Sequence, residues 1–167
     1  MTDGCAASGE PEQPVEVVVA CEQWRSACPD IEEVCLRAVR AVLAQHRYGE
    51  VSVLLDGNLR VRDLNSAWRN RDMPTNVLAF PAGPPPSQGV PHPLGSIVLA
   101  FETVCEESRE QGRLFRDHAA HLVVHGTLHL LGYDHAADED AAVMERQESR
   151  ILGSLGLGDP HCGRVNR

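Results

Sequence analysis

The segment HGTLHLLGYDH, residues 125–135, sets the expectations for the fold of this chain and for what it binds. On a helix, His125 and His129 lie one turn apart on the same face. Gly132 is suited to the left-handed conformation that commonly ends a helix, so the chain can turn back and bring His135 to the same point. Three neutral imidazoles bind zinc at about 2.0–2.1 Å and leave a fourth position open, as in catalytic zinc sites. The sequence therefore predicts one Zn²⁺ ion per chain, held by these three histidines.

The residue after the first histidine is unusual for this kind of site. The histidine spacing, with a glycine seven residues after the first one, is that of the HExxHxxGxxH metalloproteases. Those enzymes carry a glutamate base where this chain has Gly126. A glycine inside a helix costs about 1 kcal/mol relative to alanine, so it needs a reason. Our sequence-based hypothesis is that Gly126 leaves space beside the ion for a bulky substrate.

Hydrophobic periodicity on either side of this segment predicts strands and helices in a single domain. Strands are expected at 15–20, 51–55, 76–80 and 95–100, and helices at 30–47, 59–69, 102–111, 115–131 and 139–155. Asp30 and Asp138 are the expected N-terminal residues of two of these helices. The order predicts an α+β fold in which helices pack on a mixed four-stranded sheet.

The boundaries of the domain are set by composition. We expect one domain over residues 15–158, a flexible N-terminal tail over 1–14 and a C-terminal tail over 159–167. Residues 81–93 contain six of the eleven prolines and are expected to form an exposed loop.

The six cysteines form no C-x-x-C pair, and the N-terminus lacks the layout of a signal peptide. Reduced cysteines in a cytoplasmic protein are therefore expected.

Charge and hydropathy limit the classes of function. The net charge of −9 argues against nucleic-acid binding through overall charge, and no apolar run approaches the roughly 20 residues of a membrane span. All fifteen basic residues are arginines. Four of them lie within twelve residues, namely Arg60, Arg62, Arg69 and Arg71. This stretch is either a solvated face or a phosphate-binding strip, because arginine pairs with phosphate in a planar, bidentate way.

These motifs resemble those of the YbeY family of bacterial metal-dependent endoribonucleases, which are hydrolases acting on RNA phosphodiester bonds. Besides HGTLHLLGYDH, the resemblance rests on LNSAWRNRDMPTNVLAFP (64–81), LGSIVLA (94–100) and MERQESRILGSLG (144–156). It covers roughly residues 50–157. It implies that the three histidines ligate zinc on a metalloprotease-like (zincin-like) helix, with Arg69 as the functional arginine beside the metal.

The resemblance also implies a substrate and partners. The substrate is single-stranded RNA, especially small-subunit (16S) ribosomal RNA near its 3′ end. The implied role is rRNA maturation and ribosome quality control in the cytoplasm. The implied partners are the small ribosomal subunit with its proteins and an Era-like GTPase, with no membrane. Three residues depart from the family pattern: Ser96 replaces an aspartate, Ala79 a serine and Trp68 a tyrosine. Ser96 removes any carboxylate from that strand.

Several other residues are expected near this site. Arg60, Arg62 and Arg71 are expected to follow the RNA backbone. Trp68 either stacks on a base or lies in the core, and we expect the core. His118 and His121 lie on the same helix face as the first two metal ligands, where they either support a ligand or form partly buried surface.

Asp134 either orients an imidazole or caps the turn. The sequence reveals no general base, and it does not decide whether water or a ribose 2′-hydroxyl attacks. Two alternatives to an endoribonuclease stay open: a non-enzymatic ribosome-assembly factor with a structural metal, and a metallopeptidase, against which Gly126 argues.

Overall fold

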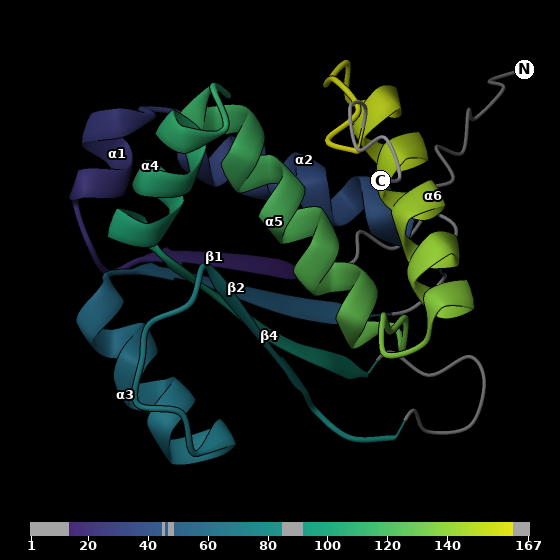
Figure 1. The fold of residues 1–167 in the computed structure, drawn as a ribbon, viewed down its shortest axis with the longest axis horizontal. Coiled ribbons are helices and arrows are strands. Elements are labelled where there is room, and N and C mark those ends of the chain that lie inside the picture. Colours follow the sequence, from purple (N-terminus) through teal and green to yellow (C-terminus); the bar gives the residue numbers. More distant parts are fainter. Residues whose placement is uncertain (1–13, 45, 47–48, 85–91, 162–167) are drawn as a thin grey trace, which may run out of the picture.

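A mixed four-stranded sheet lies at the centre of the protein, in the order β1-β2-β4-β3 (Figure 1). The computed structural model describes residues 14–44, 46, 49–84 and 92–161. The strands are β1 (Val15–Val19), β2 (Glu50–Asp56), β3 (Val77–Pro81) and β4 (Pro93–Ala100). Strands β1, β2 and β4 run parallel, and β3 pairs antiparallel with β4. The mixed four-stranded sheet predicted from the sequence is thus confirmed.

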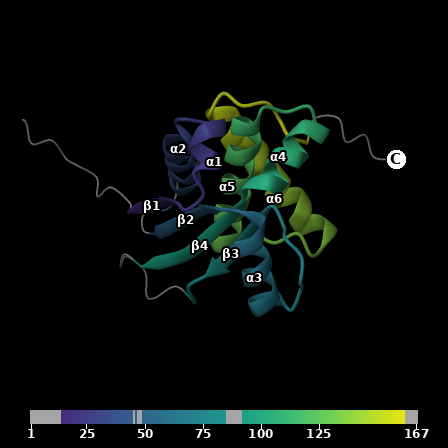
Figure 2. The ribbon, with the colours of Figure 1, turned by 90° about the vertical axis from the view of Figure 1, so that its left-hand side faces the viewer.

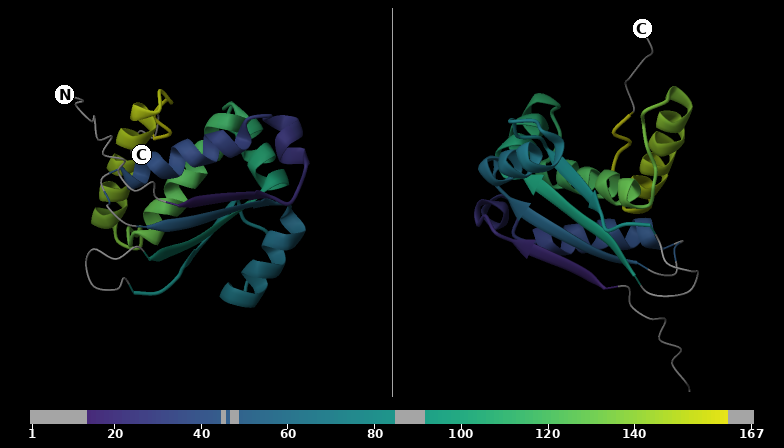
Figure 3. Two further views of the ribbon diagram at one scale, coloured as in Figure 1. Left: turned by 180° about the vertical axis from the view of Figure 1, so that it is seen from behind. Right: turned by 90° about the horizontal axis from the view of Figure 1, so that it is seen from below.

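Helices cover both faces of this sheet. They are α1 (Gln23–Ala27), α2 (Ile31–Leu43), α3 (Asn58–Arg69), α4 (Phe101–Glu110), α5 (Phe115–Leu130) and α6 (Asp138–Ser154). Figure 2 shows α2 and α5 on one face and α3 on the other. Helix α6 packs beside α5, as both views of Figure 3 show. This arrangement leaves the C-terminal end of α5 between β3 and α6.

The alternation of side chains along β4 separates two clusters of core residues. Ile97 and Leu99 are fully buried in the main core, which includes residues of α2 and α5. Val98 instead packs with Val61 of α3 and Leu78 of β3 on the opposite face. Because neighbouring residues of a strand face opposite sides of a sheet, the parity of a residue on β4 decides which cluster it joins.

The predicted apolar stripe of α2 is confirmed. Each of its six positions is buried, namely Ile31, Val34, Cys35, Ala38, Val42 and Leu43. Helix α1 was not predicted from the sequence. It contributes Trp24, which is fully buried and whose Nε1 donates to the carbonyl of Asp56 at 3.0 Å. The amphipathic repeat that predicts a helix needs several turns, and α1 has five residues.

Two expectations about single residues were wrong. Trp68 was expected in the core, but its side chain is 71% exposed on α3. Its neighbours in sequence, Ala67 and Arg69, are exposed as well, so this side of α3 faces solvent. Asp138 was expected as the N-cap of α6, but it is the first helical residue and Ala137 is the cap. Asp138 still contributes an acidic side chain to the first turn, where the helix dipole favours it. Asp30 is the N-cap of α2, although its side chain makes no capping hydrogen bond.

Some sequence-based expectations concern residues outside the described ranges. These residues are 1–13, 162–167 and the part of the proline-rich loop from 85 to 91. Among the described cysteines, Cys21, Cys28, Cys35 and Cys105 are free thiols, as expected. None of the described helices has the length and apolar character needed to cross a membrane.

Candidate metal centre

The end of α5 and the turn that follows it position the three predicted metal ligands. Gly132 has a φ of +94°, which favours glycine. Its N–H donates to the carbonyl of His129 at 3.0 Å, and the Tyr133 N–H donates to the carbonyl of Leu128 at 3.1 Å. These bonds close the last turn of the helix and reverse the chain. The reversal brings His135 back over the helix end, as the sequence predicts.

The three imidazoles converge on one point. The Nε2 atoms of His125 and His129 are 3.0 Å apart, and the ring of His135 lies 5.0 Å from that of His129 between centroids. One ring nitrogen from each histidine falls within 4.8 Å of the others. Burial, with the nearby His125 and His135, lowers the pKa of His129. A neutral imidazole is the form that binds a metal, so the group could hold a metal ion.

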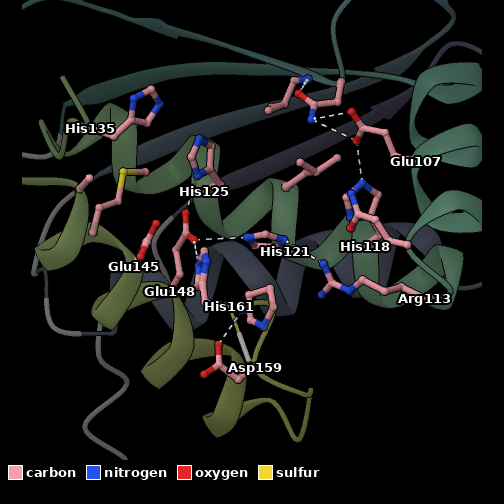
Figure 4. A pocket seen from close by; sticks show the side chains of 17 residues that line it. Glu107, Arg113, His118, His121, His125, His135, Glu145, Glu148, Asp159 and His161 are labelled. Atoms are coloured by element: carbon pink, nitrogen blue, oxygen red, sulfur yellow. Dashed lines mark hydrogen bonds and ion pairs between the residues drawn. The ribbon is translucent and has the colours of Figure 1, made fainter. Parts of the chain in front are cut away.

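A buried carboxylate behind His125 was not predicted from the sequence. Glu148 of α6 is 2% exposed and accepts a hydrogen bond from Nδ1 of His125 (Figure 4). It also bonds Nε2 of His121 at 3.2 Å and Nε2 of His161 at 2.7 Å. Burial acts to raise the pKa of Glu148, but the bonds from His121 and His125 outweigh it, so the pKa is lowered. Glu148 therefore stays ionised.

A signal for Glu148 did exist in the sequence. It lies four residues after Met144 and three before Ile151, on the buried stripe of α6. A carboxylate at such a position needs partners in the interior. His161 had no comparable signal, because it falls in the segment 159–167 that the sequence analysis expected to be a tail.

The structure separates the roles of the other candidate side chains. Asp134 Oδ1 accepts the backbone N–H of His135 at 2.7 Å, so it caps the turn. His121 hydrogen-bonds Glu148, and its ring lies edge-on to that of His125 with the centroids 6.4 Å apart. His118 is buried and bonds Glu107 at 2.7 Å, away from the three candidate ligands (Figure 4).

The structure gives Gly126 a packing role that the sequence analysis did not predict. A Cβ at this position would lie 2.9 Å from Cγ2 of Ile97, in the core between α5 and β4. Such a contact is too short for a methyl group. Gly126 is therefore required by the close approach of the helix to the sheet. It also lines a cavity that it shares with Arg69 and the three candidate ligands.

Two cavities meet at the histidines. The Arg69-side cavity, of about 620 Å³, is lined by Arg69, β3 and all three candidate ligands. The Glu148-side cavity, of about 810 Å³, extends past Glu148 toward Arg113. Both include His125 and His135 in their walls. The candidate metal site therefore borders both cavities.

The four clustered arginines differ in their surroundings. Arg69 is the last residue of α3, is exposed, and has no ion-pair partner among the described residues. Arg62 makes a bidentate ion pair with Asp72, at 2.7 and 2.9 Å. Arg60 and Arg71 are exposed and do not line the cavity that contains Arg69. Of the four, only Arg69 is brought beside the histidines.

Comparison with known proteins identifies the family of this chain. The model of the family described as "Endoribonuclease YbeY" matches residues 18–156. The chain belongs to the YbeY family. Endoribonuclease YbeY of Azorhizobium caulinodans is 45% identical over 153 residues, which are 89% of this chain and 96% of the relative. That of Paramagnetospirillum magneticum is 44% identical over 155 residues, 88% of this chain and 94% of the relative.

A solved structure supports the fold as well. The solution structure of TM1509 from Thermotoga maritima matches with a TM-score of 0.53 at 24% identity, over 90% of this chain and 99% of that one. At this identity the match concerns the fold alone.

The three departures from the YbeY sequence pattern fall in different places. Ser96 alternates with Ile97 on β4, so its side chain lies on the α3 face, away from the histidines. Ala79 lines the Arg69-side cavity. Trp68 is exposed beside Arg69, with its ring 6.0 Å from that of Phe80. The absence of a carboxylate at residue 96 therefore does not alter the immediate surroundings of the histidine group.

Proposed function

We propose that this protein is a zinc-dependent endoribonuclease specific for single-stranded RNA, acting in 3′-end maturation of 16S ribosomal RNA and in ribosome quality control. One observation carries the chemical part of the proposal. The group of His125, His129 and His135 opens into a cavity that is also lined by Arg69, which has no ion-pair partner within the described part of the chain. Imidazoles suit zinc, and an unpaired guanidinium suits a phosphodiester.

The histidines and Arg69 have different roles in the proposed reaction. When bound, zinc lowers the pKa of a coordinated water and polarises a phosphate oxygen. The three histidines hold the ion. Arg69 binds the phosphate in a bidentate manner and offsets the negative charge that develops in the transition state. Its place at the end of α3 lets it reach into the cavity while the helix anchors its backbone.

The exposed side chains of α3 favour a single strand. Trp68 presents most of its ring to solvent next to Arg69, where an unpaired base can stack on it. Arg60 and Arg71 lie exposed on the same segment, and we assign them to the flanking RNA backbone. In double-stranded RNA the bases are already stacked on each other, so Trp68 would have no free base face to bind.

A peptidase is the weaker reading of this site. In the HExxHxxGxxH arrangement the general base occupies the position of Gly126, and glycine stands there. Among the described residues that line the Arg69-side cavity, Asp134 is the one carboxylate, and its Oδ1 already accepts the His135 N–H. The ribosomal partners, namely the small subunit and an Era-like GTPase, rest on the family resemblance.

The test uses one zinc-loaded preparation freed of contaminating nucleases. It is incubated with a single-stranded RNA, the same sequence in a duplex, and casein. Cleavage of the single strand that disappears in a His129→Ala protein is the expected result. Casein hydrolysis would favour the peptidase. No cleavage by the zinc-loaded wild type, with retained binding to small subunits, would favour the assembly factor.

A further inference from the structure

We propose that Glu148 is a positioning residue that sets the tautomer and orientation of His125, and that Arg113, His121 and His161 form the hydrogen-bonded chain that holds Glu148 in place. The inference rests on the proposed metal site. It extends that site from three histidines to an outer layer of residues on α5, α6 and the segment after α6.

The first step concerns the proton on His125. An ionised carboxylate only accepts hydrogen bonds, so the ring atom that faces Glu148, Nδ1, must carry the proton. The other nitrogen, Nε2, is then unprotonated. This nitrogen is the one 3.0 Å from Nε2 of His129, on the side of the proposed ion. Glu148 therefore selects the tautomer that can ligate a metal.

The second step concerns what holds the carboxylate. Oε2 of Glu148 is contacted by His121 at 3.2 Å and His161 at 2.7 Å. Arg113 Nη1 contacts Nδ1 of His121 at 3.2 Å. A guanidinium only donates, so Nδ1 of His121 accepts and its Nε2 carries the proton toward Glu148. Neutral histidines can thus supply the donors to this buried carboxylate. Figure 4 draws the contacts of His121 and His161 with Glu148.

The third step explains how His161 is held. Asp159 Oδ1 accepts the His161 N–H at 2.9 Å and the hydroxyl of Ser149 at 2.8 Å. Because Ser149 follows Glu148 directly on α6, this bond ties the segment after the helix to the turn that carries the carboxylate. The segment therefore closes the Glu148-side cavity at the point where Glu148 needs a second donor on Oε2.

The same atoms could instead bind a second cation, since His121, Glu148 and His161 offer three ligand atoms within 4.8 Å. Two observations favour hydrogen bonding. Because Arg113 donates to Nδ1 of His121, the proton of His121 stays on Nε2, the nitrogen that would have to bind the cation. The positive charge of Arg113 also lies close to the site and would repel a cation. The distance of 2.7 Å between His161 and Glu148 is that of a charge-assisted hydrogen bond.

The main experiment compares Glu148→Gln with Glu107→Gln. Glu107 is a matched control, because it also accepts a hydrogen bond from a histidine of α5 in the same cavity, but that histidine, His118, is not a proposed ligand. Zinc affinity is measured by competition with a chromogenic chelator. Glu148→Gln is expected to weaken zinc binding about 10- to 100-fold, and Glu107→Gln to leave it unchanged. Equal zinc affinity in Glu148→Gln and wild type would overturn the proposal.

A second readout separates positioning from general stability and does not depend on RNA cleavage. Nitrogen-15 NMR of the metal-free protein reports the tautomer of His125. The wild type should carry the proton on Nδ1, and Glu148→Gln should shift population toward the Nε2 proton, because an amide N–H can donate to Nδ1. A lower melting temperature with an unchanged tautomer would mean that Glu148 is only structural. If the wild type cleaves no RNA, the proposed function fails, while the tautomer still decides this inference.

Metal stoichiometry distinguishes the hydrogen-bonded chain around Glu148 from a second cation site. The wild type should bind one zinc ion per chain, and so should His161→Ala, with a smaller loss of affinity than Glu148→Gln because two donors remain. Two ions in the wild type, one of them lost in His161→Ala, would overturn the hydrogen-bonded chain in favour of a second metal site.

Discussion

Gly126 of α5 lies directly over Ile97 of β4, so closely that a Cβ on the glycine would be 2.9 Å from Cγ2 of the isoleucine. Ile97 is fully buried, and its branched side chain has little freedom to move away. The contact sets how near α5 comes to the sheet one residue after His125. The same glycine that looks like a missing catalytic base in the sequence is thus a packing requirement of the fold.

This contact reverses the usual effect of a glycine substitution in a helix. Gly126→Ala should lower the free energy of unfolding by about 1 kcal/mol, because an overpacking cost of about 1–3 kcal/mol exceeds the helix-propensity gain of about 1 kcal/mol. Urea unfolding of the metal-free protein measures it. In an Ile97→Ala background the same substitution should become neutral or stabilising. A Gly126→Ala protein more stable than wild type would contradict the packing argument.

Each proposed ligand is expected to be necessary for tight zinc binding. His125→Ala, His129→Ala and His135→Ala should each lower zinc content well below one ion per chain, because two imidazoles are too few ligands for tight binding. Metal analysis after gel filtration checks this. Zinc should also leave the wild type as the pH falls below about 6, since ligand histidines must be neutral. Full occupancy in all three variants would refute the site.

Arg69 is expected to act on substrate rather than on the fold. Arg69→Ala should keep its zinc and melting temperature but lose RNA cleavage by roughly 100-fold or more, as when a transition-state donor is removed. Arg69→Lys should recover little, because lysine lacks the bidentate fork. Arg25→Ala is a suitable control, because Arg25 is an arginine of α1 that pairs with Glu22 and Glu32. Normal cleavage by Arg69→Ala would exclude the phosphate role.

Trp68 provides a test of single-strand preference. Since its side chain is 71% exposed, Trp68→Ala should change stability little. Binding of single-stranded RNA to the zinc-loaded protein should weaken by about 1–3 kcal/mol, the usual contribution of one stacked base. Trp68→Phe should keep much of the affinity for RNA, because phenylalanine can still stack on a base. Fluorescence anisotropy with a labelled RNA measures these affinities, and equal affinities in Trp68→Ala and wild type would remove Trp68 from the RNA surface.

His118 should make folding sensitive to acid. Burial lowers the pKa of His118, despite the opposing hydrogen bond with Glu107. Its folded pKa is then below the unfolded value of about 6.5, so protonation favours the unfolded chain. The stability it contributes is present above about pH 6.5 and is lost as the pH falls. Urea unfolding in a chelator, at about pH 7.5 and 5.5, should show a smaller acid loss in His118→Gln than in wild type. An equal loss of stability in both proteins would mean that groups other than His118 cause the acid sensitivity.

Local patterns in the sequence determined much of this protein. The histidines of α5 are four residues apart and the third follows a helix-ending glycine, so their convergence depends on one helix and one turn. The stripe of α2 and the alternation of the strands are likewise periodicities within single elements. These features follow from backbone geometry, and the sequence could predict them.

Tertiary structure decided the rest, because it depends on which elements lie side by side. Glu148 supports His125 only because α6 packs beside α5, and His161 reaches it only after the chain leaves α6. Gly126 is explained by Ile97, a residue of another element. Trp68 is 71% exposed although it shares a helix with the buried Val61. Periodicity within one element indicates which side chains share a face, but the partner of that face is set by packing between elements distant in sequence.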